Sequence, residues 1–160
     1  MKIIEYEIKY EEELKDLLVE LQKHIVSIDK YGLNILTDDY RELYYEKTMK
    51  IVKNNHGKIF LAKDDDKAIG AIIGHIEKYD KYDRCEYSCP KKGIVDELIV
   101  GNNSRSRGVG QILLKTMEEY FQSIGCEYVS IEVFAYNEGA KQFYSKFNYK
   151  PRCIDLFKKL

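Results

Sequence analysis

One continuous segment constrains this chain most, because an apolar strand pattern runs through a polar loop directly into a helix pattern. The segment covers residues 97–114, and its loop contains Arg105, Arg107, Gly108 and Gly110. A helix that begins near Gly108 leaves its first backbone N–H groups without intrahelical acceptors and directs its positive dipole end into the loop. Two arginines and two glycines there suit an anion such as a phosphate group.

The helix after the loop is predicted over residues 108–124, where apolar residues recur at three- and four-residue spacing. Gly125 supplies its C-terminal stop. Gly108 and Gly110 stand in the first turn, where the lack of a side chain allows a bulky diphosphate to approach the backbone. The loop and helix therefore predict a phosphate cradle.

Two well-known phosphate motifs do not fit this loop. The Walker pattern requires Gly-Lys-Ser/Thr, whereas Val109, Gly110 and Gln111 follow Gly108. The dinucleotide fingerprint requires a third glycine where this chain has Leu113. The pattern that remains is Arg-x-x-Gly-x-Gly, between a strand and a helix.

A second pattern lies downstream, after a strand predicted over Tyr128–Phe134. It is a helix predicted over residues 137–147 that carries Asn137, Ala140, Phe143, Tyr144 and Phe147 and is followed by Asn148 and Tyr149. Asn137 is a favourable N-cap, and Asn148 stands where the helix must end in a left-handed residue. Taken alone, the asparagines read as caps and the aromatic residues as core.

The two patterns together resemble those of the GNAT superfamily of N-acetyltransferases. In that family an Arg/Gln-x-x-Gly-x-Gly/Ala loop is followed by Asn-x-x-Ala-x-x-Phe-Tyr-x-x-x-Gly-Phe/Tyr. This chain departs from the pattern at Asn148, which replaces a glycine, and at Asn102 and Asn103, where relatives often carry a proline.

The resemblance implies that acetyl-coenzyme A is the acetyl donor. Backbone amides of the loop would hold its pyrophosphate, the end of the fourth strand would pair with its pantetheine arm, and the second helix would line the channel. The residues implied to bind acetyl-coenzyme A are Leu98, Ile99, Val100, Arg105, Arg107, Gly108, Val109, Gly110, Gln111, Asn137, Ala140, Phe143 and Tyr144. No metal is expected.

For catalysis, the resemblance makes Tyr144 the candidate general acid beside the thioester sulfur. Asp96 and Glu97 are the candidate bases, and water is an alternative to both. Strand alternation allows only one of the two to face the cleft unless a β-bulge shifts the phase. Glu132 and His75 are weaker candidates, since a lone histidine among isoleucines is more often structural.

The acceptor is predicted to be the primary amine of a small cationic molecule. In the family, the pocket is built by the segment between the first two helices and the loop before the fourth strand, which here supply Tyr31, Tyr40, Tyr44, Tyr79, Asp80, Tyr82, Asp83 and Glu86. Aromatic faces and carboxylates suit a cation. The alternatives are acetylation of a protein N-terminus or lysine, a non-catalytic sensor of acetyl-coenzyme A, and an unrelated phosphate-binding protein.

The remaining patterns predict an α/β fold, with a central mixed, mostly antiparallel sheet and helices on both faces, as in the GNAT topology. The first half reads as a strand, two helices, and two strands joined by a turn at residues 64–67, and a polar excursion over 79–92 precedes the fourth strand. The expected elements are strands 2–7, 58–63, 68–78, 93–100, 127–134 and 150–157 and helices 11–29, 38–54, 108–124 and 137–147. Thr37 or Asp38 is the expected cap of the second helix.

Composition bounds the rest. The 160 residues are expected to form one acetyltransferase domain over 1–160, and the net charge of −1 argues against nucleic acid as a partner. No apolar run approaches the length of a membrane span, so a cytoplasmic protein without membrane contact is expected. Cys85 and Cys89 are the only close pair of four cysteines and form no CxxC motif. Relatives are often dimers, which makes a homodimer an open expectation.

Overall fold

A five-stranded mixed sheet forms the centre of the computed structural model, which describes residues 1–160. The strands follow one another in chain order across the sheet, and every neighbouring pair is antiparallel except the last, which is parallel. Their bounds are β1 Lys2–Glu5, β2 Lys58–Asp64, β3 Lys67–Ile76, β4 Lys92–Val100 and β5 Tyr128–Ile131. The α/β class with a mostly antiparallel sheet is therefore confirmed.

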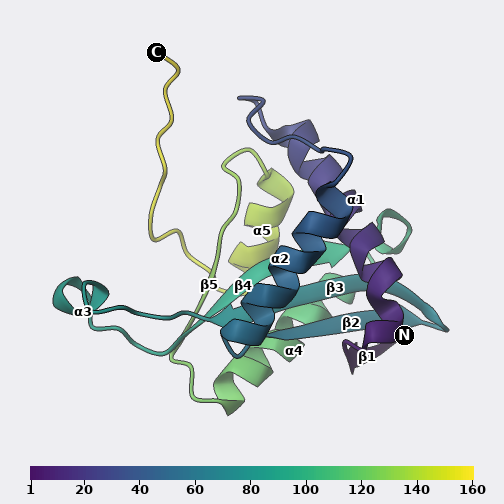
Figure 1. Cartoon of the computed structure of the whole chain (residues 1–160), viewed down its shortest axis with the longest axis horizontal. Coiled ribbons are helices and arrows are strands. Elements are labelled where there is room, and N and C mark those ends of the chain that lie inside the picture. The colour runs from purple at the N-terminus through teal and green to yellow at the C-terminus, as the bar shows by residue number, and fades with distance from the viewer.

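Helices cover both faces of the sheet, as expected (Figure 1). One face is covered by α1 (Glu11–Ile28) and α2 (Tyr40–Asn54), and the other by α4 (Val109–Ser123) and α5 (Glu138–Lys146). The short elements are η1 (Ile8–Tyr10), α3 (Asp83–Glu86) and η2 (Asn102–Ser104). None of these helices combines the length and apolar character that crossing a membrane requires.

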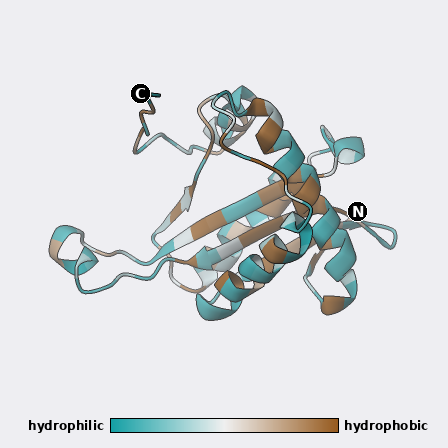
Figure 2. Cartoon of the chain, turned by 45° about the horizontal axis from the view of Figure 1, so that its top comes forward, coloured by the Kyte–Doolittle hydropathy of each residue, from teal (hydrophilic) through white to brown (hydrophobic).

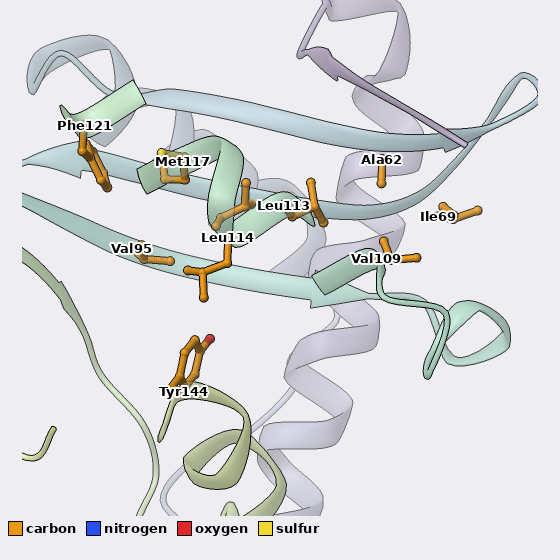
Figure 3. Close-up of a cluster of buried hydrophobic side chains, with 10 residues drawn as sticks. Ala62, Ile69, Val95, Val109, Leu113, Leu114, Met117, Phe121 and Tyr144 are labelled. Carbon is orange, nitrogen blue, oxygen red and sulfur yellow. The ribbon is translucent and has the colours of Figure 1, made fainter. Parts of the chain in front are cut away.

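Two apolar clusters, one on each face, hold the layers together. Figure 2 shows the apolar positions along the central strands that supply them. On the α4 face, Leu113, Leu114, Met117 and Phe121 are fully buried against the sheet (Figure 3). Gly93 of β4 allows this close packing, because an added Cβ would lie 2.5 Å from the Phe121 ring. On the other face, α1 buries its leucines against β2, β3 and β4.

The helix ends around the candidate site follow their sequence signals. The Asn137 side chain caps α5 by accepting a hydrogen bond from the Ala140 N–H at 3.0 Å. Asn148 is left-handed, with φ of +65°. Gly108 caps α4 with φ of +77°, a left-handed conformation that favours glycine, and the chain leaves open space where its Cβ would lie. The close approach of a diphosphate at this glycine stays a prediction.

Several expected boundaries are wrong by one to three residues. β1 ends at Glu5 because the chain turns into η1, and α2 begins at Tyr40 with no side-chain cap from Thr37 or Asp38. The Thr37 hydroxyl instead donates to the Asp39 carboxylate. β5 stops at Ile131, because its pairing with β4 ends there.

The strand expected over residues 150–157 is absent. Residues 150–160, called the C-terminal segment below, contain no helix or strand and make no backbone–backbone hydrogen bond. An alternating sequence pattern shows only that a segment can pair. To form a strand, the segment also needs the edge of a neighbouring strand within hydrogen-bonding distance. Within this chain the segment lies against no such edge.

Candidate active site

A β-bulge between β3 and β4 brings two carboxylates to one side of the sheet. Ile73 pairs with Glu97 and Gly74 pairs with Val95, so Asp96 has no partner on β3. An extra residue in one strand reverses the alternation of side chains that follow it. Asp96 and Glu97 therefore both face the α2 side, which alternation without the bulge would forbid.

The two carboxylates line a cavity of about 220 Å³ between α2, the sheet and the residue after β5. Its lining is Tyr44, Lys47, Thr48, Ile51, Ile73, Asp96, Glu97 and Glu132. Three acidic side chains and one basic side chain give the cavity a net negative character. A cavity of this charge suits a cationic group.

Glu97 is the most perturbed acid of the cavity. Burial, with a smaller contribution from the charge of Asp96, raises the pKa of its carboxyl group from 4.5 to about 7. The Tyr44 hydroxyl donates a hydrogen bond to the carboxylate, and this bond and the charge of Lys47 act in the opposite direction. A carboxylate whose pKa lies near neutral pH can both accept and release a proton.

Asp96 contacts His75 of β3 rather than a lysine or arginine. The Nδ1 atom of His75 lies 2.8 Å from the Asp96 carboxylate, and both side chains are largely buried. His75 itself is not part of the cavity lining. It therefore contacts the cavity through Asp96 and positions that carboxylate beside Glu97.

Two side chains of α2 contact the Tyr44 ring. Tyr40 stacks on it at 4.9 Å between ring centroids, and the Lys47 ammonium lies 5.1 Å from its centroid. The side chain of Lys47 thus places an ammonium group in the cavity beside Glu97. An incoming cation would compete with Lys47 for the same carboxylates.

β4 and β5 separate on the way toward the helix that follows β4. Lys92 to Val95 pair with Tyr128 to Ile131, and beyond Val95 no residue of β4 pairs with β5. The stretch from Leu98 to Val100 therefore has a free edge on the β5 side, while Ile99 pairs with Ala71 of β3 on the other. An extended polyamide can add to such an edge.

The loop at the end of β4 presents a row of free backbone donors. None of the backbone N–H groups from Arg105 to Gln111 donates to an acceptor within the chain. They occupy the loop and the first turn of α4, where the helix dipole is positive. Free amides at the start of a helix are the donors that a diphosphate group would need, so the anion cradle stays a prediction at this position.

The two arginines of the loop have partners within the chain. Arg105 donates to the carbonyl oxygen of Val100 at 3.3 Å, and Arg107 pairs with Asp64 of β2 at 2.9 Å. Both arginines are exposed at the surface. The Arg105 contact therefore connects the loop to the end of β4, and the Arg107 contact connects the loop to the β2–β3 turn.

The candidate acid lies on the opposite face of the sheet from the α2 cavity. Tyr144 is buried in the cluster on the α4 face, and it projects from α5 toward β4 and Leu114 (Figure 3). Burial raises the pKa of its hydroxyl, and the charge of Glu97 raises the pKa further. Tyr144 and the Glu97 carboxylate are thus electrostatically linked across the opening between β4 and β5.

The neighbours of Tyr144 line the space near the loop. The Phe143 ring lies edge-on to Tyr144 at 5.1 Å and borders Gly110 of α4, where an added Cβ would lie 3.6 Å from it. That Cβ would also lie 3.5 Å from Val100. The start of α4, the end of β4 and α5 therefore converge, as the resemblance implies.

The expected acceptor residues are only partly brought together. Tyr44 lines the cavity and Tyr40 supports it, but Tyr31 instead contacts the C-terminal segment. The other five expected residues, Tyr79, Asp80, Tyr82, Asp83 and Glu86, are not part of the lining and lie on an excursion around α3 that extends beyond the sheet (Figure 1). Lys47, Thr48 and Ile51 were not foreseen, although their spacing from Tyr44 on one helix face was a usable signal.

The separation of β4 from β5 and the free amides at the start of α4 are features that the resemblance to N-acetyltransferases implies. Residues 28–149 match the Acetyltransferase (GNAT) family. The chain belongs to this family. The resemblance inferred from the two sequence patterns is thereby confirmed.

A curated relative is the uncharacterized N-acetyltransferase MJ1530 of Methanocaldococcus jannaschii, which is 30% identical over 94 residues. The matched region covers 58% of this chain and 53% of the relative, so the chain spans about half of that protein's length.

Two solved structures share the fold over the whole chain. The BH1408 protein of Bacillus halodurans has a TM-score of 0.85 at 16% identity and covers 100% of this chain and 99% of its own. An aminoglycoside 6'-N-acetyltransferase of Acinetobacter haemolyticus has a TM-score of 0.72 at 14% identity with the same coverage of both chains. At these identities the likeness shows the fold alone.

Proposed function

We propose that this protein transfers the acetyl group of acetyl-coenzyme A to a primary amine of a small cationic molecule. The observation that carries the proposal is Glu97, a partly buried carboxylate with a pKa of about 7 in an acidic cavity beside the separated strands. A base of this pKa is half ionised near neutral pH, which suits the deprotonation of an ammonium group.

The free amides from Arg105 to Gln111 and the open edge of β4 support acetyl-coenzyme A as the donor. The amides fit the diphosphate, and the edge at Leu98 to Val100 fits the peptide-like pantetheine arm. Asn137, Ala140 and Phe143 belong to the same channel by resemblance. When bound, the donor supplies a thioester whose carbonyl carbon accepts the amine.

The residues of the chain then have distinct parts in the reaction. Glu97 takes a proton from the ammonium group, the neutral nitrogen forms the amide bond, and the carbon–sulfur bond breaks. Tyr144 gives its proton to the departing thiolate, whose pKa is about 8.5 by analogy with cysteine. The nitrogen loses a second proton as the amide forms, and this proton restores the Tyr144 hydroxyl, so Glu97 alone holds the one proton that the reaction releases.

The protonation of Glu97 also acts on Tyr144. The charge of Glu97 helps to hold the pKa of Tyr144 above its ordinary value. When Glu97 becomes neutral, that contribution disappears and the pKa of Tyr144 falls. The acid therefore becomes stronger at the step in which the thiolate needs a proton.

The acceptor is proposed to carry at least two positive charges. Glu132 and the Asp96 oxygen that His75 does not contact can pair with a second ammonium group when Glu97 deprotonates the first. Aminoglycosides, named as substrates of a protein with the same fold, are one such class and linear polyamines are another. Because Lys47 already lies beside the carboxylates, a cation must displace it, and Lys47→Met is expected to lower KM for the amine.

Two measurements test the proposal. Calorimetric titration with acetyl-coenzyme A is expected to show binding, and thiol release is expected with amines of the panel in wild type but not in Glu97→Gln. The matched control is Glu119→Gln on the exposed face of α4, which is expected to retain full release.

Each alternative gives a different result in the same assays. Binding without release on any amine indicates a sensor module, and release only on peptides indicates acetylation of a protein N-terminus or lysine. No binding of acetyl-coenzyme A, together with binding of a nucleotide, indicates an unrelated phosphate-binding protein. Equal release by wild type and Glu97→Gln contradicts the assignment of the base.

A further inference from the structure

One buried hydroxyl group of the cavity has no partner within the chain. Thr48 lies in the middle of α2, is only 6% exposed and lines the cavity. A threonine inside a helix can donate to the carbonyl oxygen four residues earlier, as Thr116 of α4 does to Ile112 at 2.9 Å. Thr48 makes no such bond to Tyr44 and no other hydrogen bond in the chain. Its hydroxyl is therefore free to bind a group from outside.

The free hydroxyl has contact with the cavity. Among polar side-chain atoms that are fully enclosed, only one of Glu77 lacks a hydrogen bond, so the unpartnered Thr48 oxygen keeps contact with open space. The open space that Thr48 borders is the cavity. A nearly buried polar group without a partner is unfavourable, and it is explained when a group in the cavity supplies the partner. Water can do so in the free protein, and a polar group of the acceptor replaces it on binding.

Thr48 is also close to the proposed base. It follows Tyr44 by four residues, so the two side chains lie on the same face of α2. The Tyr44 hydroxyl donates to Glu97, and all three residues line the same cavity. A group of the acceptor that reaches Thr48 is therefore near the nitrogen that Glu97 deprotonates.

The lining of the cavity limits what this group can be. Its three carboxylates accept hydrogen bonds, whereas Thr48 adds a donor that carries no charge. An ammonium group has only donors, so it pairs with the carboxylates and leaves the Thr48 hydrogen without an acceptor. A hydroxyl group both accepts and donates, so it can bind Thr48 and a carboxylate at the same time. Ile51 and Ile73 give the carbon atoms of such a molecule an apolar wall.

We propose that Thr48 is a specificity-determining residue that donates a hydrogen bond to a hydroxyl group of the acceptor. The acceptor is then an amino alcohol, such as an amino sugar or a hydroxylated diamine, rather than a linear polyamine, which carries no oxygen. The inference rests on the proposed function and narrows its acceptor to the class that contains hydroxyl groups.

Two diamines that differ by one hydroxyl group test the inference. The measured quantity is the ratio of kcat/KM for 1,3-diamino-2-propanol to kcat/KM for 1,3-diaminopropane. Thr48→Val keeps the shape of the side chain and removes the hydroxyl, so the ratio is expected to fall roughly tenfold from its wild-type value. A comparison between variants cancels the difference in basicity between the two amines.

Two control variants separate the hydroxyl from the packing of the helix. Thr48→Ser keeps the hydroxyl and is expected to retain the wild-type ratio. Thr116→Val removes a threonine hydroxyl from α4, away from the cavity, and is expected to leave the ratio unchanged. An equal loss with both diamines in Thr48→Val, at an unchanged ratio, would show that Thr48 acts only through packing and would overturn the inference.

Calorimetric titration of each diamine separates the inference from the proposed function. Thiol release with neither diamine, together with binding that favours the hydroxylated diamine in wild type but not in Thr48→Val, would contradict the proposed function and support the role of Thr48. Release or binding with one ratio in wild type, Thr48→Val and Thr48→Ser would overturn the inference alone. Neither release nor binding of either diamine would overturn both.

Discussion

Glu97→Gln is expected to stabilise the folded protein at alkaline pH while it removes activity. The pKa of Glu97 is about 7 in the folded protein, and its ordinary value is 4.5. The folded state therefore holds this proton more tightly than the unfolded state. Stability from this group is fully present below pH 4.5 and is lost as the pH rises through about 7.

The size of the effect follows from the two pKa values. A tenfold change in proton affinity corresponds to about 1.4 kcal/mol, so ionised Glu97 lowers the free energy of unfolding by about 3 kcal/mol. About 2.5 kcal/mol of this develops between pH 5 and pH 8. Glutamine is neutral at every pH and still accepts the hydrogen bond of Tyr44. The variant therefore does not lose the free energy of unfolding that ionised Glu97 costs the wild type.

Urea unfolding followed by circular dichroism measures the difference. Glu97→Gln is expected to exceed wild type in free energy of unfolding at pH 8, with the advantage shrinking toward pH 5. Glu119→Gln is expected to show no such pH dependence, because Glu119 is exposed to solvent. A stability difference that is the same at both pH values would refute the reasoning.

Three further predictions concern the same site. The acid limb of kcat/KM is expected near pH 7, the pKa of Glu97. Because Asp96 raises this pKa and Tyr44 lowers it, the limb is expected to move to lower pH in Asp96→Asn and to higher pH in Tyr44→Phe. Shifts of both variants in the same direction would contradict this. Tyr144→Phe is expected to lower kcat by about 10²-fold or more with calorimetric affinity for acetyl-coenzyme A unchanged, and unchanged kcat would exclude it as the acid. Asn137→Ala is expected to lower the free energy of unfolding by about 1 kcal/mol through loss of the α5 cap, and an unchanged urea midpoint would show that the cap contributes nothing.

Local signals predicted most of the fold because each needed only residues close in sequence. The glycine before α4, the asparagine cap of α5 and the left-handed Asn148 all act within one helical turn, and all three were placed correctly. The free amides at the start of α4 followed from the same kind of signal. The C-terminal strand was wrong because pairing depends on an edge that sequence pattern does not supply.

The acceptor side was less predictable, for a different reason. The bulge at Asp96 is set by the pairing of β4 with β3, and it decides that Asp96 and Glu97 share a cavity. The sequence therefore left the two carboxylates as alternatives. Lys47 lines the cavity because α2 packs over the sheet. This packing cannot be predicted from residues that are close together in the sequence.

Thiol release from acetyl-coenzyme A, measured against pH with a diamine or polyamine acceptor, tests the central claim most directly. We predict release that requires both the amine and Glu97, with kcat/KM falling roughly tenfold per pH unit below about pH 7. Release that persists in Glu97→Gln with the same pH profile would contradict it.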